Sequence, residues 1–260
     1  MTSLFDLTGK KAVVVGGAGG IGQAIAEAFA EAGAQVMISS RNEESLKRAI
    51  KELKESTGAD IGYFVCDATK EPEVEALLAA ALEQMGTVDI LMNSQGFNKK
   101  FPAHEFPGDV WDEMFNTNVK SMMFTCKHIG GYMYRNGIHG KIINISSVRG
   151  IRAIGNGGMG NSGYCATKGA VEMLTKSYAS EYGPGIQVNA IGPTITYTPM
   201  MYDLLPADET ARNNIAASMP AQRIGYPDDC KGPAIFLASA ASDFVTGSTI
   251  YPDGGLTACG

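Results

Sequence analysis

Short apolar runs alternate along the chain with longer segments in which apolar residues recur every three or four positions. The first pattern is typical of buried strands and the second of helices with one buried face. The expected strands cover 11–16, 35–39, 61–66, 88–92, 141–145, 186–191 and 249–251. The expected helices cover 20–32, 42–56, 72–85, 109–136, 164–182 and 227–240. Because strands and helices alternate throughout, we predict an α/β fold with one doubly wound parallel sheet of about seven strands and helices on both faces.

The composition fits one folded domain over residues 1–260 and argues against several kinds of partner. Hydrophobic residues make up 45% of the chain, which is enough for a large core. The formal net charge is −6 and no basic block stands out, so we expect no nucleic-acid partner. No apolar run approaches the ~20 residues that cross a membrane, and the first residues do not resemble a signal peptide. The five dispersed cysteines lack metal-ligand spacing, so we expect free thiols in the cytoplasm and no metal site.

A glycine-rich turn separates the first expected strand from the first expected helix. It reads Gly16-Gly17-Ala18-Gly19-Gly20-Ile21-Gly22. Glycines let the backbone approach a ligand closely, and the N–H groups at the start of the helix point toward a phosphate. The turn could also be a flexible loop, but a strand before it and a helix after it favour nucleotide binding.

Ser40 and Arg41 follow the second expected strand, where an open α/β sheet meets the adenosine ribose of a dinucleotide. An acidic side chain there would hydrogen-bond a free 2′-hydroxyl and repel a 2′-phosphate. A hydroxyl and a guanidinium suit a 2′-phosphate instead, so NADP(H) is favoured over NAD(H). NAD(H) is the alternative if Arg41 is only a solvent-exposed loop residue.

Other polar residues follow the ends of further strands. Asp67, Asn93 and Ser147 each lie at or just after the end of an expected strand. Because parallel strands end at the same edge of a sheet, these residues and Gly16 are expected to converge on one crevice.

Tyr164 and Lys168 are four residues apart in an expected helix, so their side chains share one face. A free tyrosine has a pKa near ~10, and a neighbouring ammonium would lower it. Such a pair is a candidate general acid and base for moving a proton to or from a hydroxyl. The same spacing also occurs on ordinary exposed helix faces, so the pair alone does not decide between the two interpretations.

Taken together, these motifs make the chain resemble the short-chain dehydrogenase/reductase family over nearly its whole length, which implies a Rossmann fold. The resemblance rests on the glycine turn and on Asn93-Ser94-Gln95-Gly96, Asn118, Ser147, Tyr164-x-x-x-Lys168 and the segment from Pro193 to Thr198. It implies that Asn118, Ser147, Tyr164 and Lys168 form the catalytic set and that the protein is a homotetramer. The cofactor-binding residues that it and the motifs above imply are Gly16, Gly19, Gly20, Ile21, Gly22, Ser40, Arg41, Asp67, Ala68, Asn93, Gly96, Tyr164, Lys168, Pro193, Ile195 and Thr198.

Four features depart from the family pattern. Gln95 stands where the family has alanine, Thr194 replaces a glycine, and Val15 replaces a threonine. Ser147 and Tyr164 are 17 positions apart, a few more than usual, and the extra residues fall in a glycine-rich loop. None of these changes removes a catalytic group, but the bulk of Gln95 near the cofactor is expected to change either the cofactor fit or the packing of the strand.

Three segments are expected to wall the substrate pocket, namely 97–108, 148–162 and 194–220. The first two contain Lys99, Lys100, Arg149 and Arg152. Of these we select Lys100, Arg149 and Arg152 as substrate contacts, which favours a small anionic substrate such as a sugar acid, although solvated loop cations would give the same pattern.

The resemblance implies reversible hydride transfer between a nicotinamide and a secondary alcohol. A looser likeness points to the gluconate and polyol dehydrogenase branch. Two alternatives remain: a 3-oxoacyl-carrier-protein reductase, whose basic residues would meet an acidic carrier at the outer rim, and a nucleotide-binding sensor without activity.

Overall fold

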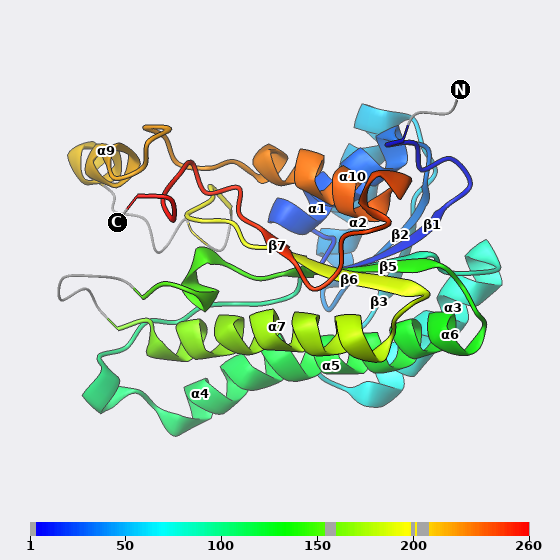
Figure 1. Ribbon diagram of the computed structural model, residues 1–260, viewed down its shortest axis with the longest axis horizontal. Helices are drawn as coiled ribbons and strands as arrows, with labels where there is room; N and C mark the ends of the chain where they lie inside the picture. Colours follow the sequence, from blue (N-terminus) through cyan, green and yellow to red (C-terminus); the bar gives the residue numbers. More distant parts are fainter. Residues whose placement is uncertain (1–3, 154–159, 199–200, 202–207, 260) are drawn as a thin grey trace.

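The computed structural model describes residues 4–153, 160–198, 201 and 208–259. Its centre is one sheet with the strand order β3-β2-β1-β4-β5-β6-β7, in which every neighbouring pair is parallel (Figure 1). The strands are β1 (Lys11–Val15), β2 (Gln35–Ser40), β3 (Gly62–Val65), β4 (Ile90–Asn93), β5 (Gly140–Ile145), β6 (Ile186–Ile191) and β7 (Thr249–Ile250). The predicted seven-stranded parallel sheet is confirmed.

Helices cover both faces of this sheet (Figure 1). The helices are α1 (Gly20–Glu31), α2 (Glu43–Thr57), α3 (Glu71–Met85), α4 (Gly108–Phe115), α5 (Ser121–Thr125), α6 (Gly131–Arg135), α7 (Ser162–Glu181), α9 (Glu209–Ala217) and α10 (Lys231–Ala238). The expected long helix over 109–136 is one helical run, because π-helical turns at Asn116–Lys120 and Cys126–Gly130 join α4, α5 and α6. Observed and expected ends differ by at most two residues, except that the first turn before α10 is a 3₁₀ helix at Pro227–Cys230.

The alternation of side chains along each strand divides the core into two layers. Val14 packs with Ile25 and Phe29 of α1 on one face of the sheet. Its neighbour Val13 packs on the other face, in a cluster that includes Met122 of α5. Both strand faces are therefore buried, which explains why the strands appear in the sequence as unbroken apolar runs. Full burial of one such side chain stabilises the fold by about 1.5–3 kcal/mol.

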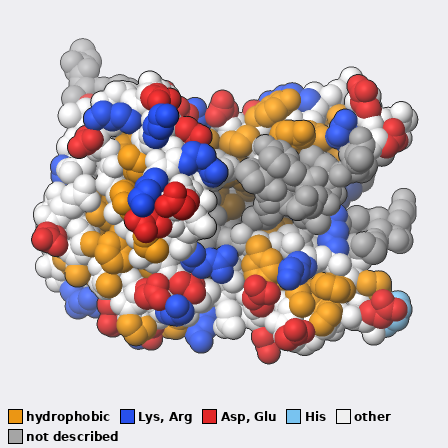
Figure 2. Space-filling model, turned by 180° about the vertical axis from the view of Figure 1, so that it is seen from behind, with side chains coloured by type: hydrophobic (Ala, Val, Ile, Leu, Met, Phe, Trp, Pro, Cys, Tyr) orange, Lys and Arg blue, Asp and Glu red, His pale blue; other side chains and the backbone are white. Residues whose placement is uncertain are grey.

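Charged side chains are dispersed over the surface. Figure 2 shows acidic and basic side chains interspersed on the face seen from behind. On α2, for example, Lys47 lies 3.1 Å from Glu43 and Arg48 lies 3.9 Å from Glu52.

Within the described parts of the chain, no helix is long and apolar enough to span a membrane.

Candidate active site

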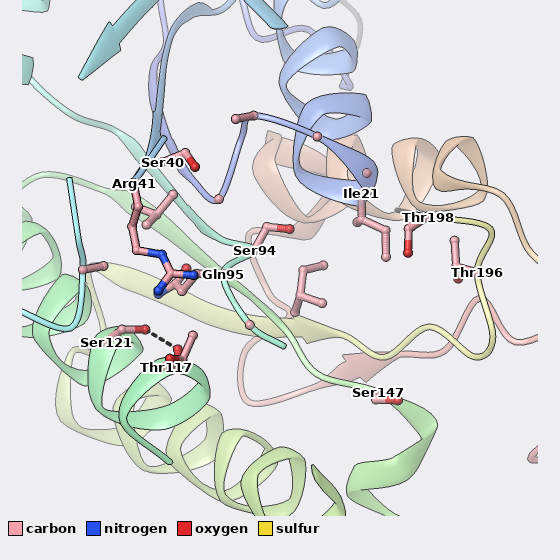
Figure 3. A pocket seen from close by; sticks show the side chains of 18 of the residues that line it. Ile21, Ser40, Arg41, Ser94, Gln95, Thr117, Ser121, Ser147, Thr196 and Thr198 are labelled. Carbon is pink, nitrogen blue, oxygen red and sulfur yellow. Dashed lines mark hydrogen bonds between the residues drawn. The ribbon is translucent and has the colours of Figure 1, made fainter. Parts of the chain in front are cut away.

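A cleft of about 430 Å³ lies at the carboxyl ends of the strands (Figure 3). The strand order reverses between β1 and β4, and such a reversal is where open α/β sheets bind ligands. The predicted site residues that line it are Gly16, Gly19, Gly20, Ile21, Ser40, Arg41, Asp67, Ala68, Gly96, Ser147, Tyr164, Lys168, Pro193 and Thr198. Residues from both halves of the chain therefore converge, as the strand ends predict.

Gly16 and Gly22 show why this turn needs glycine. Gly16 has a φ of 82°, and a Cβ there would lie 2.7 Å from the backbone nitrogen of Gln95. A Cβ on Gly22 would lie only 2.2 Å from the carbonyl oxygen of Gly16. Gly22 does not line the cleft and packs α1 against the turn, so its cofactor contact stays a prediction. Gly19 and Gly20 are left open to a ligand, so the turn fits a phosphate group.

The β2 end of the cleft is basic and rich in hydroxyl groups. Besides Ser40 and Arg41, it includes Ser45 and Arg48 of α2. The sequence analysis missed this second pair, although their spacing of three residues near the start of a helix places them on one face. Two guanidinium groups and two hydroxyl groups can together hold a phosphate monoester.

Asp67 lies on the same side of the cleft as Arg41. Burial alone would raise the pKa of its carboxyl group. Hydrogen bonds from Thr69 and the charge of Arg41 outweigh burial, so the pKa falls below its ordinary value. Asp67 is therefore a carboxylate at neutral pH and can accept a hydrogen bond from a ligand.

Two further predicted cofactor residues do not line the cleft. The amide of Asn93 is buried and donates to Asn144 Oδ1 at 2.9 Å, while its Oδ1 accepts from Thr125 Oγ1 at 2.7 Å. Asn93 thus ties β4 to β5 and α5 and has no amide group directed at a ligand. Ile195 uses its backbone carbonyl to accept from the N–H of Gly225 at 3.0 Å. For both residues, the cofactor contact stays a prediction.

Ser147 and Tyr164 meet at the other end of the cleft. The Ser147 hydroxyl group hydrogen-bonds with Tyr164, donates to the carbonyl of Pro193 at 3.3 Å and accepts from the N–H of Arg149 at 3.2 Å. The neighbouring Ser146 turns its hydroxyl group to the carbonyl of Lys168 at 3.5 Å. The structure therefore selects Ser147 over Ser146 as the serine that accompanies Tyr164.

The pKa of Tyr164 differs from the value that the sequence predicts. Burial raises it to about 12, although the hydrogen bond with Ser147 acts in the opposite direction. Lys168 does not lower it as expected, because its ammonium group donates to the carbonyl of Ile145 at 2.7 Å and lies 5.6 Å from the centre of the Tyr164 ring. Burial in turn lowers the pKa of Lys168 to about 8, with the charge of Glu172 opposing that shift.

Asn118 lies in the π-helical turn between α4 and α5 and acts as a clamp. Its Oδ1 accepts from the N–H of Phe97, and its amide donates to the carbonyl of Phe97, both at 2.9 Å. The same amide donates to Thr167 Oγ1 of α7 at 3.0 Å. The side chain therefore joins the segment after β4 to α7, and it does not itself line the cleft.

The three predicted substrate cations have different surroundings. Arg149 is near Tyr164, and burial lowers its pKa while its guanidinium donates to the carbonyl of Ala153 at 3.1 Å. Arg152 donates instead to the carbonyls of Leu256 and Cys259, the second at 3.2 Å. Lys100 does not line the cleft. Arg149 lies near Tyr164 but, like Lys100 and Arg152, is not among the residues that line the cleft. The three substrate contacts therefore stay predictions. Residues 154–159, 199–200 and 202–207 of the predicted pocket walls lie outside the described part of the chain.

Comparison with known proteins gives matches over nearly the full chain. A family model described as enoyl-(acyl carrier protein) reductase matches residues 16–257. The gluconate 5-dehydrogenase of Gluconobacter oxydans is 38% identical over 255 residues, which are 98% of this chain and 97% of that protein. The 2-dehydro-3-deoxy-D-gluconate 5-dehydrogenase of Bacillus subtilis is 40% identical over 252 residues, 96% of each chain.

Solved structures also match the chain over nearly its full length. The crystal structure of a gluconate 5-dehydrogenase from Burkholderia cenocepacia, in complex with NADP and tartrate, superposes with a TM-score of 0.90 and 35% sequence identity. The match covers 98% of this chain and 98% of that one. The glycine turn, the Ser147–Tyr164 pair and these full-length matches lead to one conclusion: the chain belongs to the short-chain dehydrogenase/reductase family of oxidoreductases.

Proposed function

We propose that the protein is an NADP(H)-dependent dehydrogenase that interconverts a secondary alcohol and a ketone on a small polar substrate of the sugar-acid or polyol type, with an anionic sugar acid preferred. The observation that supports it best is the hydrogen-bonded pair of Ser147 and Tyr164, next to the buried Lys168, at one end of a cleft that starts at a phosphate-binding turn. Relatives named for gluconate oxidation support the substrate class.

The preference for NADP(H) follows from the β2 end of the cleft. Arg41 and Arg48 bring two positive charges to the place where the adenosine 2′-position would lie, and Ser40 and Ser45 add hydroxyl donors. A structure relative crystallised with NADP is consistent with this assignment. When bound, the nicotinamide supplies or accepts the hydride.

In the reductive direction Tyr164 acts as the acid. Its raised pKa keeps the phenol protonated at neutral pH, so it can donate to the developing alkoxide. Ser147 donates a hydrogen bond to the same oxygen and stabilises its negative charge. In the oxidative direction Tyr164 must take up a proton, which becomes easier if the ammonium of Lys168 moves from the Ile145 carbonyl toward the phenol.

Arg149 supports an anionic substrate. Its guanidinium is half-buried near Tyr164, where a carboxylate on the substrate would compensate its charge. Lys99 lies at the rim, 4.0 Å from Glu113, and Arg152 is directed at the C-terminal segment. A carrier-protein reductase, to which one relative belongs at 33% identity, would need basic charge on the outer rim. Because Arg149 lies near Tyr164 and not at the rim, we rank that reaction second.

An oxidation assay tests the proposal. It offers a panel of sugar acids, polyols and hydroxy acids with NADP⁺ and with NAD⁺ and follows the reduced nicotinamide by its absorbance at ~340 nm. We expect turnover of a sugar acid that is faster with NADP⁺, and its loss in Tyr164→Phe with NADP(H) affinity unchanged. Tyr178→Phe, which removes a phenol elsewhere on α7, is the matched control. If the protein binds the cofactor but turns over none of these compounds, and does not reduce acyl thioesters either, the result would instead favour a nucleotide-binding sensor without activity.

A homotetramer in the reducing cytoplasm is part of this proposal. Large apolar side chains are exposed on the helices of one sheet face, among them Trp111 of α4, Tyr134 of α6 and Met173 of α7. Such a face is typical of surfaces that are covered by another subunit. Light scattering coupled to size exclusion measures the mass directly, and a monomer would contradict this part of the proposal.

A further inference from the structure

Gln95 has a side-chain amide that is buried and has no partner. Among the described residues, neither its Oε1 nor its Nε2 makes a hydrogen bond, and almost no surface of either atom is open to solvent. Burial of an unpaired amide destabilises a fold, and such groups in native proteins usually have a partner that binds them. Gln95 lines the cleft, so a ligand in the cleft can become that partner once the amide turns out of its buried position.

The backbone of Gln95 fixes where its side chain can reach. It packs against the glycine turn, since a Cβ on Gly16 would lie 2.7 Å from the Gln95 nitrogen. Figure 3 shows the Gln95 side chain at the same end of the cleft as Arg41, with Thr117 and Ser121 below and Ser147 at the opposite end. The backbone of Gln95 thus lies between the glycine turn and Gly96, where a Cβ would lie 3.7 Å from Lys168 Nζ, and its side chain is drawn on the Arg41 side of the cleft.

The cofactor orientation follows from the catalytic end. A nicotinamide must lie beside Ser147 and Tyr164, and the phosphates lie over the glycine turn. The adenosine half then occupies the end marked by Arg41. At that end Ser121 already donates its hydroxyl hydrogen to the carbonyl of Thr117 at 2.6 Å. Gln95, by contrast, has both a donor and an acceptor unused.

Adenine offers the complementary pair of groups. Its N6 amine is a donor and its neighbouring N7 is an acceptor, and a glutamine amide can bind both at once. Phosphate oxygens are acceptors only and would satisfy just the Nε2 group. We propose that Gln95 binds the adenine ring of the cofactor, with its Oε1 accepting a hydrogen bond from N6 and its Nε2 donating one to N7. This inference rests on the proposed function, because it needs a nicotinamide dinucleotide in the cleft.

The test compares two ligands by calorimetric titration without substrate: NADPH and its deaminated analogue, in which hypoxanthine replaces adenine. Hypoxanthine has an oxygen acceptor at C6 beside N7, and the amide cannot match two acceptors. We expect the wild type to prefer NADPH and Gln95→Ala to reduce the ratio of the two dissociation constants by about tenfold. Because the ratio is compared between variants, contacts of other residues with the base cancel.

Asn98→Ala is the matched control. Asn98 has another buried, unpaired side-chain oxygen three residues further on, but it does not line the cleft. The ratio should stay at the wild-type value in this variant. Gln95→Met, which keeps the side-chain length, replaces the alanine variant if alanine prevents folding.

The outcomes separate the two hypotheses. A wild-type protein that binds neither ligand overturns the proposed function. A wild-type protein that binds NADPH, with the same ratio in Gln95→Ala as in the wild type, overturns the role of Gln95 alone. A reduced ratio in Gln95→Ala with an unchanged ratio in Asn98→Ala supports it.

Discussion

Replacing Lys168 with methionine should change how the stability of the protein depends on pH. The Lys168 side chain is only 3% exposed, and burial lowers its pKa from 10.5 to about 8. In the unfolded chain the same group keeps its proton up to about pH 10.4. The folded protein therefore carries a charge at neutral pH that burial penalises, offset in part by the hydrogen bond to the Ile145 carbonyl.

The sign of the effect follows from proton binding. Between pH 8 and 10.5 the unfolded state binds more protons than the folded state, so the free energy of unfolding rises with pH through this window. At 1.36 kcal/mol for each pKa unit, the contribution of Lys168 grows by about 2.5 kcal/mol between about pH 7 and pH 10. Below pH 8 the group is protonated in both states and the full burial cost remains. Methionine has a similar length and no charge, so the variant lacks this contribution.

Urea unfolding at a series of pH values between about 7 and 10 measures the difference. The stability of Lys168→Met relative to the wild type should fall by about 2.5 kcal/mol across the series, whatever its value at pH 7. Tyrosines and cysteines that titrate in the same range are present in both proteins and cancel. Protein concentration is held constant because association would shift the midpoint.

Lys176→Met is the control, since Lys176 is an exposed lysine two turns further along α7. Its stability difference from the wild type should be nearly independent of pH. If the Lys168→Met difference were equally flat, or rose with pH, the folded protein would not lower the pKa of this lysine, and the inferred cost of burial would be wrong.

Three other changes have clear expected outcomes. Gly22→Ala should lower the free energy of unfolding by about 2 kcal/mol, because its Cβ meets the Gly16 carbonyl, whereas Gly19→Ala, whose Cβ meets nothing, should not; urea unfolding of both decides. Asn118→Leu should cost about 2 kcal/mol because it leaves the N–H and carbonyl of Phe97 unpaired, and an unchanged thermal midpoint would refute the clamp. Arg152→Ala should speed amide hydrogen exchange over residues 256–259 while leaving β1 protected, and equal exchange in the wild type would show that these contacts are not formed in solution.

The sequence predicted the fold and the centre of the site because both depend on local patterns. Apolar runs and helical periodicity located the strands, and parallel topology then brought the strand ends to one edge. The spacing of Tyr164 and Lys168 correctly placed both on one helix in the cleft. Arg41 was found because it follows a strand end directly.

The sequence did not predict the direction and burial of several side chains. Asn93 ends a strand, as a ligand-binding residue would, but its direction depends on the pairing with Asn144 and Thr125, far away in sequence. Arg152 finds carbonyl partners more than 100 residues further on, which no local pattern signals. The direction of the Tyr164 pKa was wrong because the sequence argument counted the charge of Lys168 and not the loss of solvent.

The contacts of Arg152 also matter for anyone who prepares this protein. They hold Leu256 and Cys259 next to the segment that follows Ser147. Figure 1 shows the first described residues at the other end of the molecule. A bulky group attached close to Cys259 would therefore compete for the space and the hydrogen bonds of the segment that follows Ser147. Leu4 is remote from that segment, so recombinant protein for kinetic work should carry its affinity tag at the amino end.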